Sequence, residues 1–162
     1  MIDIYDCEAI IKCYRYLEMK CEAIDKSINS NALYYGPSLS EFGAEDVLNT
    51  IMNLIERKNK LINMKVILDN AVKSLDDLDR QILYIKMHYS LSIGEICGIL
   101  GTYDRNVFRR CERAFGNLAK ILNTSSYAEK LSKMLDTEVW ISAVRSNIRE
   151  RHLSYNTAIN NP

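Results

Sequence analysis

The near absence of proline constrains the fold of this chain more than any other feature of its sequence. Pro37 is the only proline before the last of the 162 residues. A proline in the interior of a helix breaks or kinks it, and long proline-free stretches with apolar residues at every third or fourth position are typical of α-helices. The sequence therefore predicts an all-α protein with one clear interruption, near Pro37.

The first 73 residues carry two long helical patterns. Between residues 3 and 29, apolar and semi-apolar positions alternate in steps of three and four, which places them on one stripe of a helix. This first stripe comprises Cys7, Ile10, Tyr14, Leu17, Cys21, Ile24 and Ile28. The segment NALYYGPSLSEFG then ends the pattern with glycine and proline.

A second long helix is expected over residues 44–73. Its stripe comprises Val47, Ile51, Leu54, Leu61, Leu68 and Val72, and is interrupted by Lys58 and Lys65. Two long helices with a short connection fold back as an antiparallel hairpin. Each helix alone exposes an apolar stripe, so the hairpin is either a scaffold or an arm for dimerisation or partner binding.

The next region, residues 74–122, begins with signals for two helix starts. Ser74 and the acidic residues after it suit the N-terminus of a helix. The stripe of that helix comprises Leu78, Ile82, Ile85 and Tyr89. Ser92 and Glu95 have the spacing of a capping box, and the short helix that follows is expected to end at Gly101, because glycine adopts the left-handed conformation without penalty.

The helix after Gly101 is expected to have a packed side and a basic side. It starts near Asp104, and its core stripe comprises Val107, Cys111, Ala114, Leu118 and Ile121. Arg105 and Arg109 lie about 180° from this stripe, with Arg113 to one side and Arg110 near the core boundary. Arginine is the favoured partner of guanine and also binds phosphate.

These features together are typical of a DNA-binding helix-turn-helix. The two helices of that motif cross steeply, so the inner position of the first must be small, as Cys97 and Gly98 are. Gly101 allows the turn, and the second helix then lies in the major groove with its N-terminal half at the base edges. An ordinary helical hairpin with a solvated arginine face is the alternative.

Residues 75–122 resemble region 4 of the sigma-70 family of bacterial transcription factors. The resemblance rests on the segments LDRQIL at 78–83, SIGEIC at 92–97, LG at 100–101, and on Val107 followed by RAFGNL at 113–118. With a helical region in front, the layout is similar to the small phage and prophage regulators of the ArpU and RinA type. Arg110 departs from the family, which has an apolar residue there, and Cys111 is expected to take over the packing.

The resemblance implies a set of DNA-facing residues. They are Tyr103, Asp104, Arg105, Phe108, Arg109, Glu112 and Arg113, with Ser92 meeting a phosphate at the amide end of its helix. Phe108 either touches a thymine methyl or packs against the first helix. From its residue type, Asn106 is expected to pair with adenine or to hold a phosphate.

Two further helices are expected near residues 127–135 and 138–151, after a loop at NTSS and before a frayed polar tail. Trp140, Ile141, Val144 and Ile148 share one side of the later helix, while Arg145, Arg149 and Arg151 lie elsewhere. Trp140 is interpreted as a core residue. A second contact to DNA or to a partner protein is the alternative for this helix.

Composition and motifs exclude several classes of protein. The formal net charge is zero, which excludes a generally sticky polycation but leaves room for a local basic patch. No phosphate-binding loop, G-x-S-x-G or His-Glu-x-x-His motif is present, so we expect neither an enzyme nor a metal or other cofactor. No apolar run is long enough to span a membrane, and no secretory signal is recognised.

The five cysteines are predicted to be reduced and buried, as in a cytoplasmic protein, because their number is odd and they have neither Cys-x-x-Cys nor zinc-site spacing. A redox sensor is the alternative reading of these residues. No pair of cysteines close in sequence supports it.

Three domains are predicted: a hairpin over 1–73, the helix-turn-helix over 74–122 and a C-terminal helical extension over 123–162. The expected function is sequence-specific binding of double-stranded DNA in transcription control, by a homodimer that also contacts RNA polymerase. The alternatives are a DNA-packaging subunit like the small terminase subunits of phages, and a helical adaptor that binds no DNA.

Overall fold

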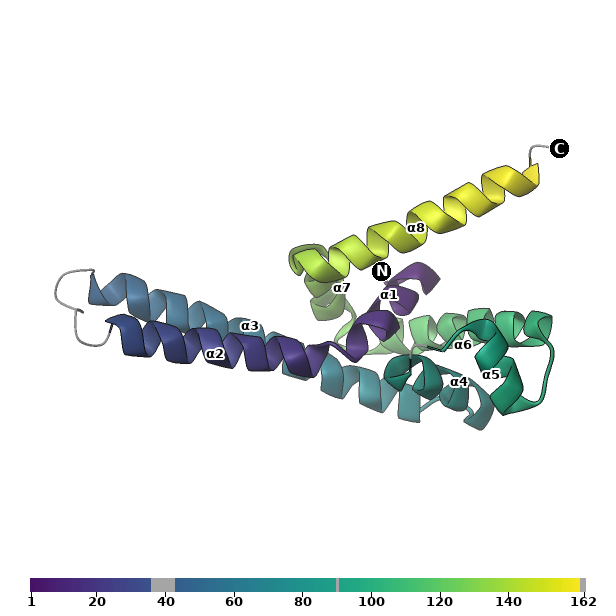
Figure 1. Ribbon diagram of the computed structural model, residues 1–162, viewed down its shortest axis with the longest axis horizontal. Helices are drawn as coiled ribbons and strands as arrows, with labels where there is room; N and C mark the ends of the chain where they lie inside the picture. Colours follow the sequence, from purple (N-terminus) through teal and green to yellow (C-terminus); the bar gives the residue numbers. More distant parts are fainter. Residues whose placement is uncertain (36–42, 90, 161–162) are drawn as a thin grey trace. The chain divides into compact units, whose positions relative to one another are not determined.

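A computed structural model describes residues 1–35, 43–89 and 91–160, and over these ranges the chain is helical without any strand (Figure 1). The all-α prediction is confirmed. The helices are α1 (Ile4–Tyr14), α2 (Leu17–Tyr35), α3 (Ala44–Lys73), α4 (Asp77–His88), α5 (Ile93–Leu100), α6 (Asp104–Thr124), α7 (Ala128–Thr137) and α8 (Val139–Asn160). The predicted interruption at Pro37 lies outside the described residues.

The single helix predicted over residues 3–29 is wrong, because the backbone turns at Arg15 and Tyr16 between α1 and α2. Neither glycine nor proline marks this turn. Helix α1 is instead delimited by its packing, since it contacts α4, α6 and α8 and buries most of its side chains among them. At its last residue, the Tyr14 hydroxyl donates a hydrogen bond of 2.5 Å to Asp69 Oδ1.

The chain divides into two units, one of residues 1–15 with 67–162 and one of residues 16–66. The first unit therefore joins α1 to helices that follow it by more than fifty residues. The predicted division into domains at residues 73 and 122 stays a prediction.

In the second unit, α2 and α3 lie side by side (Figure 1), and ion pairs join them. Lys58 Nζ lies 2.7 Å from Asp25 Oδ1, and Lys65 pairs with Glu18. The two lysines that interrupt the apolar stripe of α3 are thus matched by carboxylates of α2. Because Asp25 follows Glu18 along α2 while Lys58 precedes Lys65 along α3, the two helices run in opposite directions at these pairs.

In the first unit, the start and the buried face of α4 differ from the prediction. Asp76, not Ser74, is the N-cap of α4, and its side chain accepts from the Asp79 amide at 2.9 Å. The Ser74 hydroxyl donates to the Asn70 carbonyl at the end of α3 instead. The buried residues of α4 are Asp79, Ile82, Leu83 and Met87, so Leu78, Ile85 and Tyr89 lie off the core face.

The C-terminal part begins and ends differently from the prediction. Helix α6 continues to Thr124, into the predicted NTSS loop, and α8 continues past Arg151 to Asn160. Ile141 and Ile148 are buried in the core, whereas Trp140 is only half-buried. The Trp140 indole donates to Glu138 Oε2 at 3.1 Å.

A buried carboxylate ties α1 to α8. The Asp6 side chain is only 2% exposed and lies 2.7 Å from Arg145 Nε and 3.0 Å from Arg149 Nη2. The first contact is an ion pair by distance, although its N–H is not aligned as a hydrogen bond. Burial lowers the pKa of Arg145, but the hydrogen bond to Asp136 and the charge of Asp6 outweigh it and raise the pKa. Two of the three arginines of α8 are therefore held by the protein's own acids.

Substitution Asp6→Ala is expected to lower the free energy of unfolding by about 3–5 kcal/mol, because it leaves Arg145 without its buried partner. Urea denaturation measures this change. The matched control is Asp136→Ala, which removes a 64% exposed carboxylate from the same arginine and is expected to cost less than about 1 kcal/mol. Equal losses for the two variants would contradict a special role of the buried pair.

Candidate nucleic-acid interface

The N-terminus of α5 forms the predicted capping box. The Glu95 amide donates to Ser92 Oγ at 3.3 Å, and the Ser92 amide donates to Glu95 Oε2 at 2.7 Å. The Ser92 hydroxyl lies 2.7 Å from the same carboxylate oxygen. These bonds from the Ser92 amide and hydroxyl hold the pKa of Glu95 below its ordinary value. The amide end of α5 is thus occupied by a carboxylate of its own helix.

The turn after α5 also follows the prediction. Gly101 has φ 59° and ψ 38°, the left-handed conformation that ends a helix, and the amides of Gly101 and Thr102 both donate to the Cys97 carbonyl. Gly98 was expected to allow the close crossing of the two helices, but its surroundings do not require a glycine. A Cβ atom built on Gly98 would have nothing within 4 Å, so Cys97 alone, which is 8% exposed, meets the packing requirement.

Helix α6 packs its predicted stripe into the core of the first unit. Val107, Cys111, Ala114 and Leu118 are buried, whereas Ile121 is half-buried and the neighbouring Leu122 is fully buried. The helix contacts α5, α4 and α1 on this side. The sigma family has an apolar residue at the position of Arg110. In this chain Arg110 is exposed, and Cys111, one position later, is buried.

All nine predicted DNA-facing residues are exposed. They are Ser92, Tyr103, Asp104, Arg105, Asn106, Phe108, Arg109, Glu112 and Arg113. Eight of them lie on α6 or on the residue before it, and Ser92 caps α5. The α6 residues are therefore all accessible on the part of the helix that does not face the core.

The arginines of this surface differ in their partners. Arg105, Arg109 and Arg110 form no ion pair or hydrogen bond with any residue that the structure describes, whereas Arg113 is held by α4. Its Nη2 lies 2.9 Å from Asp76 Oδ2, and its Nε lies 3.6 Å from the buried Asp79. The Asp79 amide, followed by the Arg113 guanidinium, holds the pKa of Asp76 below its usual range. Arg113 thus presents less free positive charge than its neighbours.

The remaining residues of the surface are polar or aromatic. Asn106 Nδ2 donates a long bond of 3.4 Å to Thr102 Oγ1, which leaves the amide oxygen accessible. Phe108 is 47% exposed, so its ring is not buried under α5. Burial, followed by the neighbouring Asp104 carboxylate, raises the pKa of Cys97 to about 11.

The other cysteines are also poor nucleophiles. All five are free thiols, and Cys21 is half-buried while the rest are buried. Burial raises the pKa of every one of them, that of Cys13 to about 12. Thiolate formation is therefore suppressed, as the prediction of buried cysteines implies.

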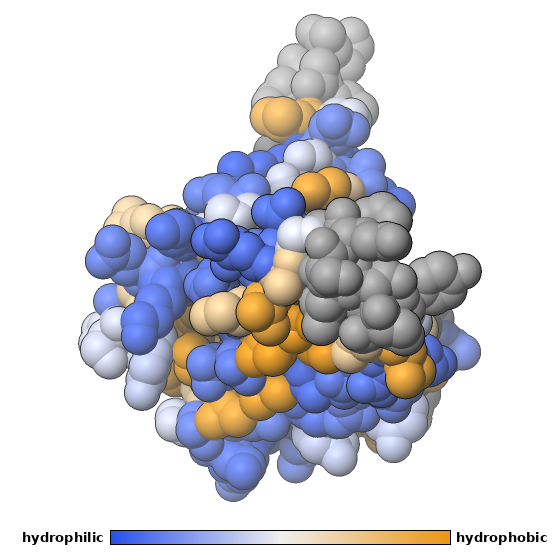
Figure 2. All heavy atoms as spheres, turned by 90° about the vertical axis from the view of Figure 1, so that its left-hand side faces the viewer, coloured by the Kyte–Doolittle hydropathy of each residue, from blue (hydrophilic) through white to orange (hydrophobic). Residues whose placement is uncertain are grey.

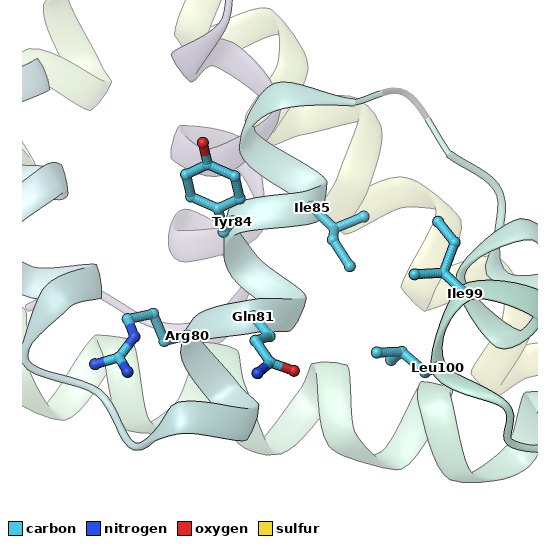
Figure 3. A pocket seen from close by; sticks show the side chains of 6 residues that line it. All are labelled: Arg80, Gln81, Tyr84, Ile85, Ile99 and Leu100. Carbon is cyan, nitrogen blue, oxygen red and sulfur yellow. The ribbon is translucent and has the colours of Figure 1, made fainter.

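A shallow depression between α4 and α5 was not anticipated from the sequence. It has a volume of about 460 Å³ (Figure 3). Its lining consists of Arg80, Gln81, Tyr84, Ile85, Ile99 and Leu100. The periodicity of α4 assigned Ile85 to the core, which concealed this feature.

Two other kinds of site are not found among the described residues. No group of three histidine, cysteine, aspartate or glutamate side chains in these ranges is placed to hold a metal ion. None of the described helices combines the length and the apolar character needed to cross a membrane.

Comparisons with protein-family models, curated proteins and solved structures found no match to this chain. The likeness to sigma region 4 accordingly depends on the residues of 75–122 themselves.

Substitution Gly101→Ala is expected to lower the free energy of unfolding by about 1–2 kcal/mol, because a Cβ atom is unfavourable in the left-handed conformation. The matched control is Gly98→Ala, in the same short helix and with open space around the new methyl group. This control is expected to stabilise by roughly 0.5–1 kcal/mol through higher helix propensity. Denaturant titration of both variants measures the difference, and a destabilised Gly98→Ala variant would contradict this account of α5.

Proposed function

We propose that this protein binds double-stranded DNA sequence-specifically and controls transcription, with α5 and α6 acting as a helix-turn-helix similar to sigma-70 region 4. The observation that carries the proposal is the set of unpaired arginines on the exposed face of α6. Arg105 and Arg109 lie one helical turn apart, and neither has a carboxylate partner among the described residues. Arg110 adds a third free guanidinium about 100° further round the helix, nearer to the core boundary.

Four other arginines of the chain, by contrast, have acidic partners. Arg80, Arg113, Arg145 and Arg149 are all in ion pairs. In a chain with zero net charge, three adjacent unpaired arginines form a local positive field. An anionic partner such as a nucleic-acid backbone would be attracted to this face and not to the protein as a whole.

The burial of α6 supports docking by its N-terminal half. Phe115, Leu118, Ala119 and Leu122 are buried, so the C-terminal half is committed to the core. The first two turns expose Arg105, Asn106 and Arg109. A helix presented in this way fits a major groove about 12 Å wide, where arginine reads guanine and asparagine reads adenine.

Phosphate contacts would come from the arginines in preference to Ser92. A phosphate at the start of α5 would have to displace the Glu95 carboxylate, which already accepts from the Ser92 amide. Arg105 and Arg110 have no such competitor. Glu112, on the same face, suits the amino group of cytosine.

The proposal includes a homodimer in which α2 and α3 form an antiparallel hairpin. A single module of this kind buries little surface on DNA, and a second copy supplies the missing affinity. Contact with RNA polymerase belongs to the proposal only through the resemblance to the sigma family.

Substitution Arg109→Ala is expected to weaken binding to the preferred DNA by about 1–3 kcal/mol and to relax specificity at one base pair. Selection of bound duplexes from a random pool, followed by affinity measurements at several salt concentrations, tests this. The matched control is Lys133→Ala, which removes one exposed positive charge from α7 and should leave the selected sequence unchanged.

Equal affinity and equal selectivity of the Arg109→Ala variant and the unaltered protein would count against α6 as the reading helix. Binding that shows no salt dependence would favour an adaptor that does not bind DNA. A ring-shaped oligomer would favour a packaging subunit.

A further inference from the structure

Helix α3 carries a second apolar stripe beside the one that faces α2. Its members follow one another in steps of four and three: Leu48, Met52, Ile55, Asn59, Ile62 and Val66. All six are exposed, and the five apolar side chains have exposed fractions between 42% and 65%. Figure 2 shows one face of the molecule, on which hydrophobic side chains lie at the surface among hydrophilic ones.

This second stripe has the repeat of a coiled-coil seam. Apolar residues that alternate in steps of four and three occupy the a and d positions of a heptad, where Met52, Asn59 and Val66 are a positions. Each member follows a residue of the α2-facing stripe by one position, so the two stripes are about 100° apart around the helix. Within the second unit, α3 therefore has two apolar faces, and α2 covers one of them.

We propose that the second stripe is covered by the same stripe of a second copy of this chain, with the two α3 helices parallel and in register. Asn59 carries this assignment. A single asparagine at an a position is favourable when it meets the asparagine of an identical, in-register partner, because the two amides hydrogen-bond to each other. Asn59 is exposed and has no hydrogen-bond partner among the described residues.

The other helix of the unit does not offer a matching surface. The outward face of α2 runs through Met19, Ala23, Lys26, Ser30 and Leu33 and is apolar only near its ends. If the second stripe of α3 packed against this face of α2 in the second copy, Lys26 and Ser30 would be buried without gaining apolar contacts. Pairing α3 with α3 places apolar residues opposite apolar residues along the whole stripe.

The stripe residues themselves favour the parallel orientation. In the antiparallel alignment that matches all six of them, Asn59 lies opposite Ile55 of the second copy, so its amide would be buried against an apolar side chain without a hydrogen-bond partner. In the parallel, in-register pair, the amide meets Asn59 of the second copy. The flanking residues Glu56 and Lys58 already form ion pairs within their own chain and contribute little to the choice.

The stripe is long enough for a specific interface. Residues 48–66 span about 28 Å of helix. The stripe residues and their flanking side chains would bury on the order of 500 Å² per partner, which is close to the total of about 1,000 Å² that a specific interface needs. The contact is isologous, because the same residues meet across a two-fold axis.

The inference deepens the proposed function, on whose dimer it rests, by naming the surface that joins the copies. A parallel pair brings residue 66 of both copies to the same end of the interface. The segments that lead on towards α5 and α6 of each copy then start at the same end, which is compatible with binding to two half-sites on one duplex.

The mass of the full chain in solution, measured by light scattering or sedimentation at micromolar concentration without DNA, tests the interface. The unaltered protein is expected to be a dimer, and Ile55→Glu or Ile62→Glu to raise the dissociation constant by about a hundredfold or more, because like charges would meet at the two-fold axis. Far-UV circular dichroism should stay unchanged, since both side chains are exposed. The control Met19→Glu changes a similarly exposed apolar residue on α2 and should leave the mass unchanged.

Orientation and register are tested by Met52→Cys under mild oxidation, which leaves Asn59 in place. Parallel pairing in register brings position 52 of both copies together, whereas antiparallel pairing brings it beside position 62. A covalent dimer is therefore expected that the unaltered protein, with its largely buried cysteines, does not form. A dimeric variant without this cross-link would overturn the parallel register. A monomeric unaltered protein, or an Ile55→Glu variant that dimerises normally, would overturn the interface itself.

These outcomes are separate from a failure of the proposed function. All masses are measured without DNA, and Arg109→Ala lies outside the stripe. A dimer that is disrupted by Ile55→Glu but does not bind DNA would retain the interface and reject DNA binding. A protein that binds DNA as a monomer would retain the proposed DNA binding and reject the interface.

Discussion

The first unit depends on the burial of α1 among α4, α6 and α8. Ile10 and Ile11 are fully buried there, and Asp6 binds two arginines of α8. Asn123, near the end of α6, exchanges two hydrogen bonds with the backbone of Ile2, at 2.9 and 2.8 Å. Because the core face of α6 is fixed from this side, its opposite face, with the unpaired arginines, is left to solvent. The position of the candidate interface thus follows from contacts made by residues at the other end of the chain.

Local signals in the sequence predicted local structure well. The capping box at Ser92 and Glu95 and the left-handed Gly101 depend on hydrogen bonds and φ angles within a few residues, and both are present. The bounds of α3 were predicted because apolar residues recur at helical spacing over most of its length, with interruptions only at Lys58 and Lys65. The turn at Arg15 was not predictable in this way, since the apolar period continues through it and only packing in the first unit determines it. The buried face of α4 was also misassigned. It includes the buried Asp79, which a pattern of apolar residues does not count.

Partners within the protein determine which candidate residues remain free to bind. Arg109 and Arg113 are both exposed and lie one turn apart on α6. The sequence alone therefore predicts both as DNA-facing residues and does not distinguish them. Arg113 is nevertheless held by Asp76, the N-cap of α4, and by Asp79, which also accepts from Asn117 at 2.7 Å. This network joins α6 to α4 and fixes the helix that presents Arg109. One arginine therefore has a positioning role, whereas the other is available to a partner.

The same reasoning separates the two stripes of α3. Lys58 and Lys65 interrupt the inner stripe, but Asp25 and Glu18 of α2 neutralise them, so this stripe is satisfied within one chain. Asn59 interrupts the outer stripe and has no counterpart among the described residues of its own chain. A polar residue within an apolar seam specifies the partner that can satisfy it. Carboxylates on α2 satisfy the lysines of the inner stripe, and for the outer stripe the complementary group is an identical amide, which a second copy of the chain provides.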